Sequence, residues 1–186
     1  MTSIDQFFRR VSHVARGCPT AVLTDAVLQA AEDFCERTWL WLEDLPPIQT
    51  VDGQTAYTVA APTYAAILAI KSLTIDGSTA PFTSSTRNRV TLVSDPGPDK
   101  ALVAEAALKP SRTAKVLPDF LYVEWQDAIA AGARFKLLDM HGAEWHQPQL
   151  ADKYRLEFER LWVPRARVEG AHRQGRPLSV RKRRFI

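Results

Sequence analysis

The stretch ALVAEAALK, residues 101–109, alternates apolar residues with more polar ones. In an extended chain Glu105 and Lys109 fall on one face, and the opposite face carries Leu102, Ala104, Ala106 and Leu108. This period of two residues is typical of a half-buried antiparallel strand. The stretch therefore predicts a sheet, and the segments around it should supply the other strands.

Turn signals upstream of this stretch predict further strands. RVTLV (89–93) is one strand candidate, separated from residues 101–109 by the turn sequence SDPGPDK. Two Asp-Gly pairs lie between β-rich runs, which is a strong hairpin signal. The pairs are Asp52-Gly53 in IQTVDGQTAYTV (48–59) and Asp76-Gly77 in AILAIKSLTIDGSTAPF (66–82). We therefore expect an antiparallel β-region over residues 39–110.

The residues before and after this β-region have apolar side chains at helical spacing. AIAAGA (128–133) leaves a shallow stripe that a neighbouring helix can approach closely. Pro164 is expected to kink the last helix or end its regular part. The predicted helices cover residues 3–16, 20–38, 118–140 and 149–168, and the last should point Leu150, Tyr154, Phe158 and Leu161 inward.

The order of these elements predicts an α+β fold. We expect a helical bundle of about four helices, with the antiparallel β-region inserted between the second and third helices, and an extended basic C-terminal arm. The length of 186 residues suits one domain. That domain is assigned to residues 1–164, and residues 165–186 form the basic end of the last helix and the arm.

Basic residues are concentrated at the C-terminal end. The net charge is +3, but residues 165–186 contain eight Lys and Arg against the single acid Glu169. The rest of the chain then has 16 basic and 20 acidic residues, a net charge of −4. The main part of the chain is therefore not an obvious nucleic-acid binder, and the basic end is expected to meet a partner outside its own domain.

The sequence contains neither a long apolar segment nor a secretory signal pattern, so we expect a cytosolic protein without a membrane span. If the two cysteines, Cys18 and Cys35, lie at opposite ends of one helix, they are roughly 25 Å apart. A disulfide needs Cα atoms about 5.5 Å apart. Both should therefore be free thiols.

No pattern of catalytic residues is present. HGAEWH (141–146) has two histidines and a glutamate, but the spacing matches no zinc motif, and Gly142 and Pro148 favour a loop. Neither of the glycine-rich phosphate-binding motifs occurs. We therefore predict no catalytic, cofactor or metal site, and no enzyme.

The aromatic stretch TWLWLEDLPPI (38–48) allows two interpretations. Trp39 and Trp41 alternate with leucines, which suits a junction in the core between helix and sheet. Alternatively, one of these faces is covered by another subunit, because Trp is enriched at interfaces. Trp39, Trp41, Asp76 and Gly77 are therefore candidate contacts with other subunits or with a tail-side component.

Several segments resemble one known family. They are AAEDFCERTWLWLEDLPPIQTVDGQTAYTV (30–59), LPDFLYVEWQDAIAAGARFKLLDMHGAEW (117–145), LADKYRLEFER (150–160) and the basic end RPLSVRKRRFI (176–186). Together, and in this order, they resemble the head-to-tail adaptor, or connector, proteins of tailed bacteriophages and phage-derived particles.

The resemblance implies a structural virion component at the head–tail junction, assembled in the host cytoplasm. Such adaptors form a ring, commonly a dodecamer, that joins the portal protein to the next tail component: a stopper, a tail terminator or a nozzle. DNA passes through the ring during genome ejection without sequence-specific binding, and no membrane is involved. The residues expected to bind the portal protein are Arg176, Arg181, Lys182, Arg183, Arg184, Phe185 and Ile186.

Two other classes of function stay open. One is a small nucleic-acid-binding protein whose basic C-terminal arm follows phosphates. Against it, no predicted helix of the main part has a basic face, and Phe185 and Ile186 end the arm. The other is a small enzyme whose site is assembled only in space.

Overall fold

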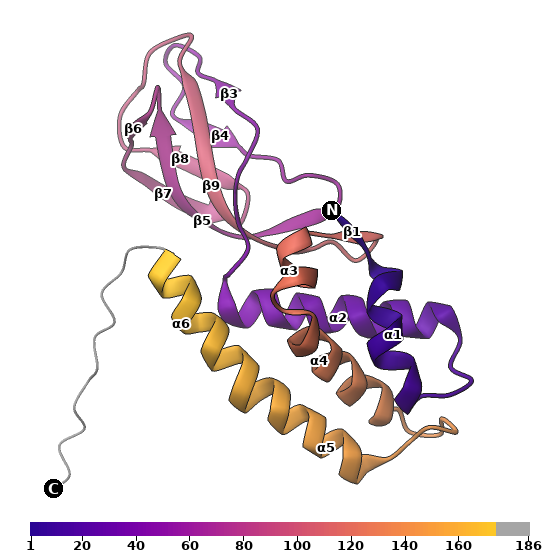
Figure 1. Ribbon diagram of the computed structural model, residues 1–186. Coiled ribbons are helices and arrows are strands. Elements are labelled where there is room, and N and C mark those ends of the chain that lie inside the picture. The colour runs from indigo at the N-terminus through magenta and orange to yellow at the C-terminus, as the bar shows by residue number, and fades with distance from the viewer. Residues whose placement is uncertain (174–186) are drawn as a thin grey trace, which may run out of the picture.

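The structure is a computed structural model that describes residues 1–173. The helices lie together at one end, and most of the strands form a separate part at the other (Figure 1). The helical segments are η1 (Ile4–Phe7), α1 (Phe8–Val11), η2 (Ser12–Val14), α2 (Thr20–Thr38), α3 (Asp119–Val123), α4 (Gln126–Leu138), α5 (Pro148–Glu157), the π-helical η3 (Phe158–Trp162) and α6 (Val163–Arg173).

The described strands form three antiparallel sheets. A five-stranded sheet has the order β2-β9-β5-β6, with β3 also paired to β9, and a three-stranded sheet has the order β4-β8-β7. A short pair, β1-β10, ties the N-terminus to the segment before α3. The strands are β1 (Thr2–Ser3), β2 (Leu42–Asp44), β3 (Ile48–Gln49), β4 (Ala56–Thr58), β5 (Ala65–Ile75), β6 (Ser78–Thr79), β7 (Phe82–Thr86), β8 (Arg89–Leu92), β9 (Ala101–Pro110) and β10 (Val116–Leu117).

The fold is α+β, but the predicted helical bundle with an inserted β-region is wrong. The β part is a major layer of the fold, with one large curled antiparallel sheet and two further sheets, and the helices are more numerous than the four expected. The expectation treated residues 39–110 as an attachment, because local hairpin signals do not reveal which distant strands pair. The long pairing of β5 with β9 joins residues far apart in the sequence and makes the sheet the second centre of the fold.

Strand β9 occupies the middle of the large sheet, as its alternating sequence favours. The face formed by Leu102, Ala104, Ala106 and Leu108 is at most 1% exposed. One edge of β9 pairs with β5, and the other pairs with β2 and then β3. Pro46 and Pro47 separate β2 from β3, because proline cannot donate a ladder hydrogen bond and is tolerated at such an edge.

The two Asp-Gly turns have different outcomes. Asp76 and Gly77 have φ values of 48° and 79° and connect β5 to β6, so this hairpin prediction is confirmed. The prediction of a hairpin at Asp52-Gly53 is wrong: β3 before it pairs with β9, whereas β4 after it pairs with β8. The turn forms, but it directs the chain from one sheet to another.

The central helical contact joins α2 to α4. Helix α2 has the bounds expected from sequence, and its buried face includes Ala30 and Phe34. A Cβ atom added to Gly132 of α4 would lie 3.1 Å from the Ala30 Cβ atom and 3.2 Å from the Phe158 ring. The small residues of AIAAGA thus allow α2, α4 and η3 to pack at close range.

Two of the predicted helices are broken. The first, expected over residues 3–16, is a short α-helical turn between two 3₁₀ segments. The third, expected over residues 118–140, is divided into α3 and α4 at Glu124 and Trp125. Trp125 is 2% exposed and lies against Phe34, with ring centroids 5.4 Å apart, so tertiary packing of this aromatic side chain accompanies the break.

The last helix passes Pro164 instead of ending there. The π-helical turn η3 ends two residues before Pro164 and changes the hydrogen-bond spacing in the turn where the proline lacks an N–H. The turn also shifts the inward-facing positions by one residue. Trp162, Val163 and Ala166 face the core, whereas Leu161, which was expected to point inward, is 63% exposed.

Both cysteines are free thiols. Cys35 is fully buried, and burial raises the pKa of its thiol far above the usual range, with Glu32 and Glu36 adding to the effect. Cys18 is half-buried, and burial also raises its pKa. Because only thiolates react and only accessible ones meet reagent, the two sites should differ strongly in reactivity.

We expect a thiol reagent such as DTNB, at about pH 8, to label Cys18 in the native protein and Cys35 only after unfolding. The measurement is the absorbance change before and after adding denaturant. The variant Cys18→Ser should be almost unreactive when native. A native Cys18→Ser protein that reacts as fast as the wild type would show that Cys35 is not buried.

Candidate interaction surfaces

The residues expected to bind a portal protein lie outside the described part of the chain. They are Arg176, Arg181, Lys182, Arg183, Arg184, Phe185 and Ile186. The neighbouring residues 165–173, which the sequence assigned to the basic end, continue α6 and pack on the fold. Ala166 is fully buried, and a Cβ atom at Gly170 would lie 3.5 Å from Leu40 Cδ1. The basic end therefore begins from a helix that is anchored to the core.

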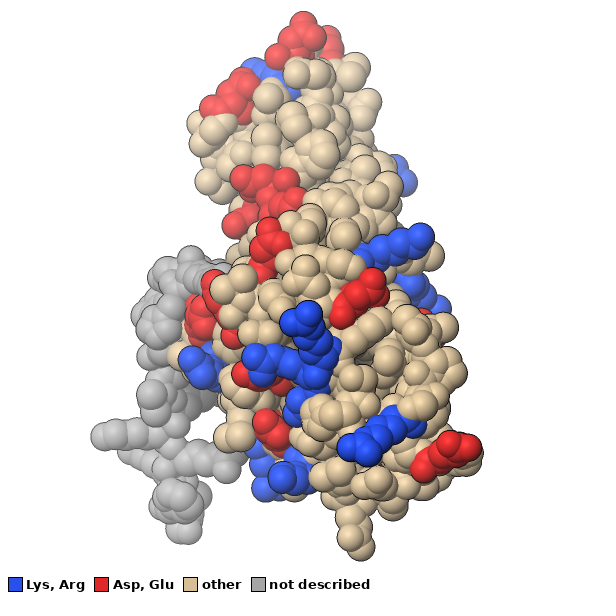
Figure 2. Space-filling view, turned by 45° about the vertical axis from the view of Figure 1, so that its right-hand side comes forward, with Lys and Arg blue, Asp and Glu red and all other residues tan. Residues whose placement is uncertain are grey.

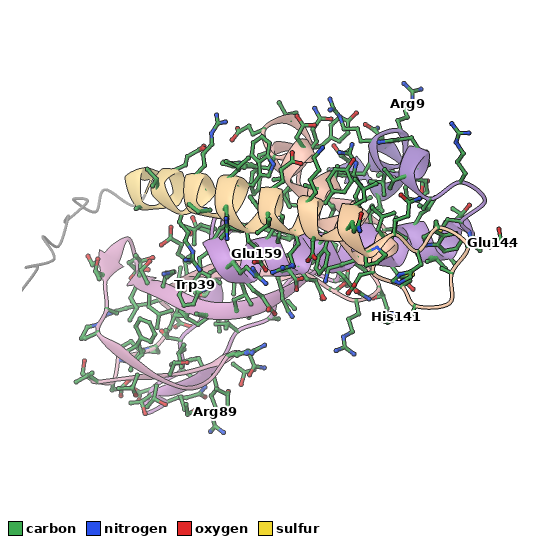
Figure 3. The ribbon with its side chains drawn as sticks, turned by 90° about the horizontal axis from the view of Figure 1, so that it is seen from below. Arg9, Trp39, Arg89, His141, Glu144 and Glu159 are labelled. Carbon is green, nitrogen blue, oxygen red and sulfur yellow. The ribbon has the colours of Figure 1, made fainter. Side chains whose placement is uncertain are left out.

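Trp39 is exposed at the junction between the helical and β parts. It follows α2 directly, with φ at 52°, a left-handed conformation that is unusual for a large side chain. Trp39 is 38% exposed, and its ring centroid lies 4.0 Å from the Lys71 Nζ atom, a cation–π contact. Figure 3 shows Trp39 between α6 and the β part. Trp39 is thus available to a neighbouring molecule.

Trp41 is instead part of the core of the chain. It is 2% exposed, stacks on Tyr64 and donates its indole N–H to Glu43 at 3.0 Å. Tyr64 also donates to Glu43, and the pKa of Tyr64 is raised, first by burial and then by the Glu43 carboxylate. Trp41 therefore fits the first interpretation of TWLWLEDLPPI, a junction in the core between helix and sheet. The second interpretation, a face covered by another subunit, applies only to Trp39.

The Asp76-Gly77 turn is exposed at the end of the β part. The Asp76 carboxylate accepts a hydrogen bond from the Ala101 N–H at 3.0 Å, and its backbone N–H donates to the Ala101 carbonyl. These bonds fix the turn to the start of β9. The turn is therefore a rigid feature that a partner could recognise.

An exposed apolar stripe runs along η3 and α6. Leu161 and Val168 are 63% and 46% exposed, and Pro164 is exposed between them. Their spacing of three and four residues places them on one face of the helix. Arg160 and Arg165 flank the stripe. We call these five residues the α6 stripe.

Arg165 has aromatic neighbours. Its guanidinium carbon lies 5.9 Å from the Trp125 ring centroid and 6.0 Å from the Trp162 ring centroid. Within the described part of the chain, neither Arg165 nor Arg160 forms an ion pair. Arg165 is thus near two indole rings, at the outer limit of cation–π distance, and its exposed guanidinium can reach a partner.

A second patch lies on the large sheet. Asp44 on β2 is directly opposite Glu105 on β9, so the two carboxylates share one face of the sheet. The residues two positions earlier on each strand, Leu42 and Val103, share that face and are half-buried. Ser72 donates to Glu105 at 3.1 Å, but in residues 1–173 no basic group pairs with either carboxylate. We call these four residues the sheet patch.

Acidic and basic residues gather on different parts of the surface. Figure 2 shows acidic residues gathered where the β part meets the helical part, and basic residues mostly over the helices. Several of the helical charges are compensated within the chain: Lys136 pairs with Asp33 at 2.7 Å and Lys109 with Glu36 at 2.7 Å. A groove of about 560 Å³ beside the Lys136–Asp33 pair is lined by three acids of α2 and by the basic residues Arg112 and Lys136. Its opposite charges balance closely, so it favours no particular ligand.

The histidines of HGAEWH form no metal site with their neighbours. His141 and His146 have ring centroids 4.7 Å apart, and His146 Nδ1 lies 3.0 Å from the Leu138 carbonyl oxygen. In the described residues, no group of three His, Cys, Asp or Glu side chains could hold a metal ion. Figure 3 shows His141 and Glu144 on the loop at the far end of the helical part. No helix within residues 1–173 is long and apolar enough to cross a membrane.

Sequence reasoning missed the α6 stripe and the sheet patch. The stripe depends on the π-helical turn, for which regular helical spacing gives no signal. The sheet patch depends on the register of β2 against β9, although the acids of LED (42–44) next to the Trp-Leu alternation were visible. Comparisons with protein-family models and with curated proteins found no match.

Proposed function

We propose that this chain is a ring-forming head-to-tail adaptor of a tailed bacteriophage or phage-like particle. It joins the portal protein to the next tail component and leaves a channel for DNA. Its place is the virion head–tail junction, and it is assembled in the host cytoplasm. The observation that carries the proposal is the ordered resemblance of residues 30–59, 117–145, 150–160 and 176–186 to that family.

The structure supports the proposal in the way these segments meet. Residues 30–59 form the end of α2 and the first strands, and residues 117–145 form α3 and α4. Residues 150–160 belong to α5 and η3, which pack against α4. Within residues 1–173, the resembling segments thus build one connected unit, and its surface carries apolar patches suited to protein partners.

The charge distribution also supports a channel protein. The chain without residues 165–186 has a net charge of −4. Like charge repels the phosphate backbone, so such a ring would not retain passing DNA. The excess of basic over acidic residues is confined to residues 165–186, which would reach acidic groups of a portal protein.

Size-exclusion chromatography with light scattering, with and without the portal protein of the same phage genome, tests the proposal. We expect this chain to join the portal in a multi-subunit complex of defined stoichiometry, with twelve copies as the expected number. Salt-sensitive binding to DNA, without any portal complex, would instead favour the nucleic-acid-binding alternative.

A further inference from the structure

We propose that the α6 stripe of one copy packs on the sheet patch of the next copy. The inference rests on the proposed ring and names the surfaces that build it. The two patches differ in character: one is apolar and basic, and the other is apolar and acidic. A contact between two different patches is heterologous, and such contacts generate rings when the rotation closes.

The first argument is that the stripe is exposed by a specific feature of the backbone. A regular helix would bury Leu161, but the π-helical turn moves it to 63% exposure and brings Trp162 inward. π-Helical turns inside helices are frequently found at functional sites. Here the turn creates an apolar row on the surface, and a partner would cover it.

The second argument concerns four charged groups that form no ion pair within the described part of the chain. Directly opposite like charges destabilise a sheet, so the Asp44–Glu105 pair has a cost within the isolated subunit. A guanidinium group between the two carboxylates would remove this repulsion and form charge-assisted hydrogen bonds. Arg160 and Arg165 supply such groups, and both are exposed on the α6 stripe.

The third argument is that the apolar residues match as well. Leu161, Pro164 and Val168 on the stripe would meet Leu42 and Val103, which are only half-buried in the subunit. A buried apolar centre with charged pairs around it is the usual composition of a specific protein interface. Both patches lie on helical or strand backbone with hydrogen bonds of its own, so their geometry is largely fixed before contact.

Cross-linking between two differently tagged copies tests this contact. One copy carries Val168→Cys at the C-terminal end of the stripe, and the other carries Pro46→Cys, two residues beyond Asp44. Both copies also carry Cys18→Ser, and the buried Cys35 stays unreactive. With a short bismaleimide, this mixture should give several-fold more heterodimer than a control mixture in which Thr86→Cys, exposed at the end of β7, replaces Pro46→Cys.

Charge reversal shows whether the yield comes from the proposed pairing. Arg160→Glu in the stripe copy should reduce the cross-linking several-fold, and Asp44→Arg in the other copy should restore it. Both side chains are exposed, so each reversal should leave the fold intact. Yields equal to the Thr86→Cys control, or yields that do not respond to Arg160→Glu, would overturn the inference. The same tagged copies, assembled with portal protein, distinguish the proposed ring from the proposed contact between its subunits. Rings that form without this cross-link would overturn only the contact between the α6 stripe and the sheet patch.

Discussion

Replacing Gly132 by leucine should lower the free energy of unfolding by about 3 kcal/mol. The smallest side chain at this position would already place its Cβ atom 3.1 Å from Ala30 and 3.2 Å from the Phe158 ring. Ala30 belongs to the fully buried face of α2, and Phe158 is packed against Phe34 with ring centroids 6.4 Å apart, so neither neighbour can easily move. Urea denaturation followed by circular dichroism measures the change.

Gly170 provides a matched control in another helix. A Cβ atom there would lie 3.5 Å from Leu40 Cδ1, which is an ordinary contact. Because glycine in a helix costs about 1 kcal/mol relative to alanine, Gly170→Ala should be neutral or stabilising by up to that amount. Gly132→Ala should be destabilising despite the same gain in helix propensity. If both alanine variants change the free energy of unfolding by the same amount, α2, α4 and η3 are not in close contact at Gly132.

Removing the residues after Arg173 should abolish binding to the portal protein, with a loss of affinity of about a hundredfold or more. The removed segment contains Arg181 to Arg184, which can form bidentate bonds with carboxylates, and the apolar pair Phe185 and Ile186. A segment that only followed phosphates would have no use for that pair. Binding measured by light scattering or calorimetry gives the loss, and circular dichroism should show an unchanged fold.

A double variant, Phe185→Ala with Ile186→Ala, isolates the apolar part of that effect. It keeps every charge, so a purely electrostatic arm would bind as before. We expect weaker portal binding even at low salt, because buried apolar anchors contribute independently of screening. Full portal binding by both variants, together with a loss of salt-sensitive DNA binding in the truncated chain, would identify a nucleic-acid arm instead.

The sequence predicts local elements of this fold better than their assembly. Helix α2 and the buried face of β9 follow from periodicity, because each buries one continuous face. Gly132 is found at a close helix contact, as its small neighbours indicate. The Asp52-Gly53 turn shows the limit: the dipeptide specifies a local turn, but long-range pairing with β9 and β8 decides where the flanking strands go.

The candidate surfaces were harder to predict, because they too depend on the assembled backbone and not on local sequence patterns. Leu161 has the correct spacing for burial, and only the π-helical turn before Pro164 reverses its position. Trp39 and Trp41 look equivalent in sequence, yet one is 38% exposed and the other 2%. The difference comes from the left-handed conformation of Trp39, which turns the chain between the helix and the sheet.

Electron cryomicroscopy of this chain co-assembled with the portal protein of its own phage genome tests the central claim most directly. The account predicts a closed ring of this chain, coaxial with the portal, with the C-terminal residues on portal subunits. It also predicts that Arg181 to Arg184 do not line the bore. A portal that carries no ring of this chain, or a bore lined by those arginines, would contradict it.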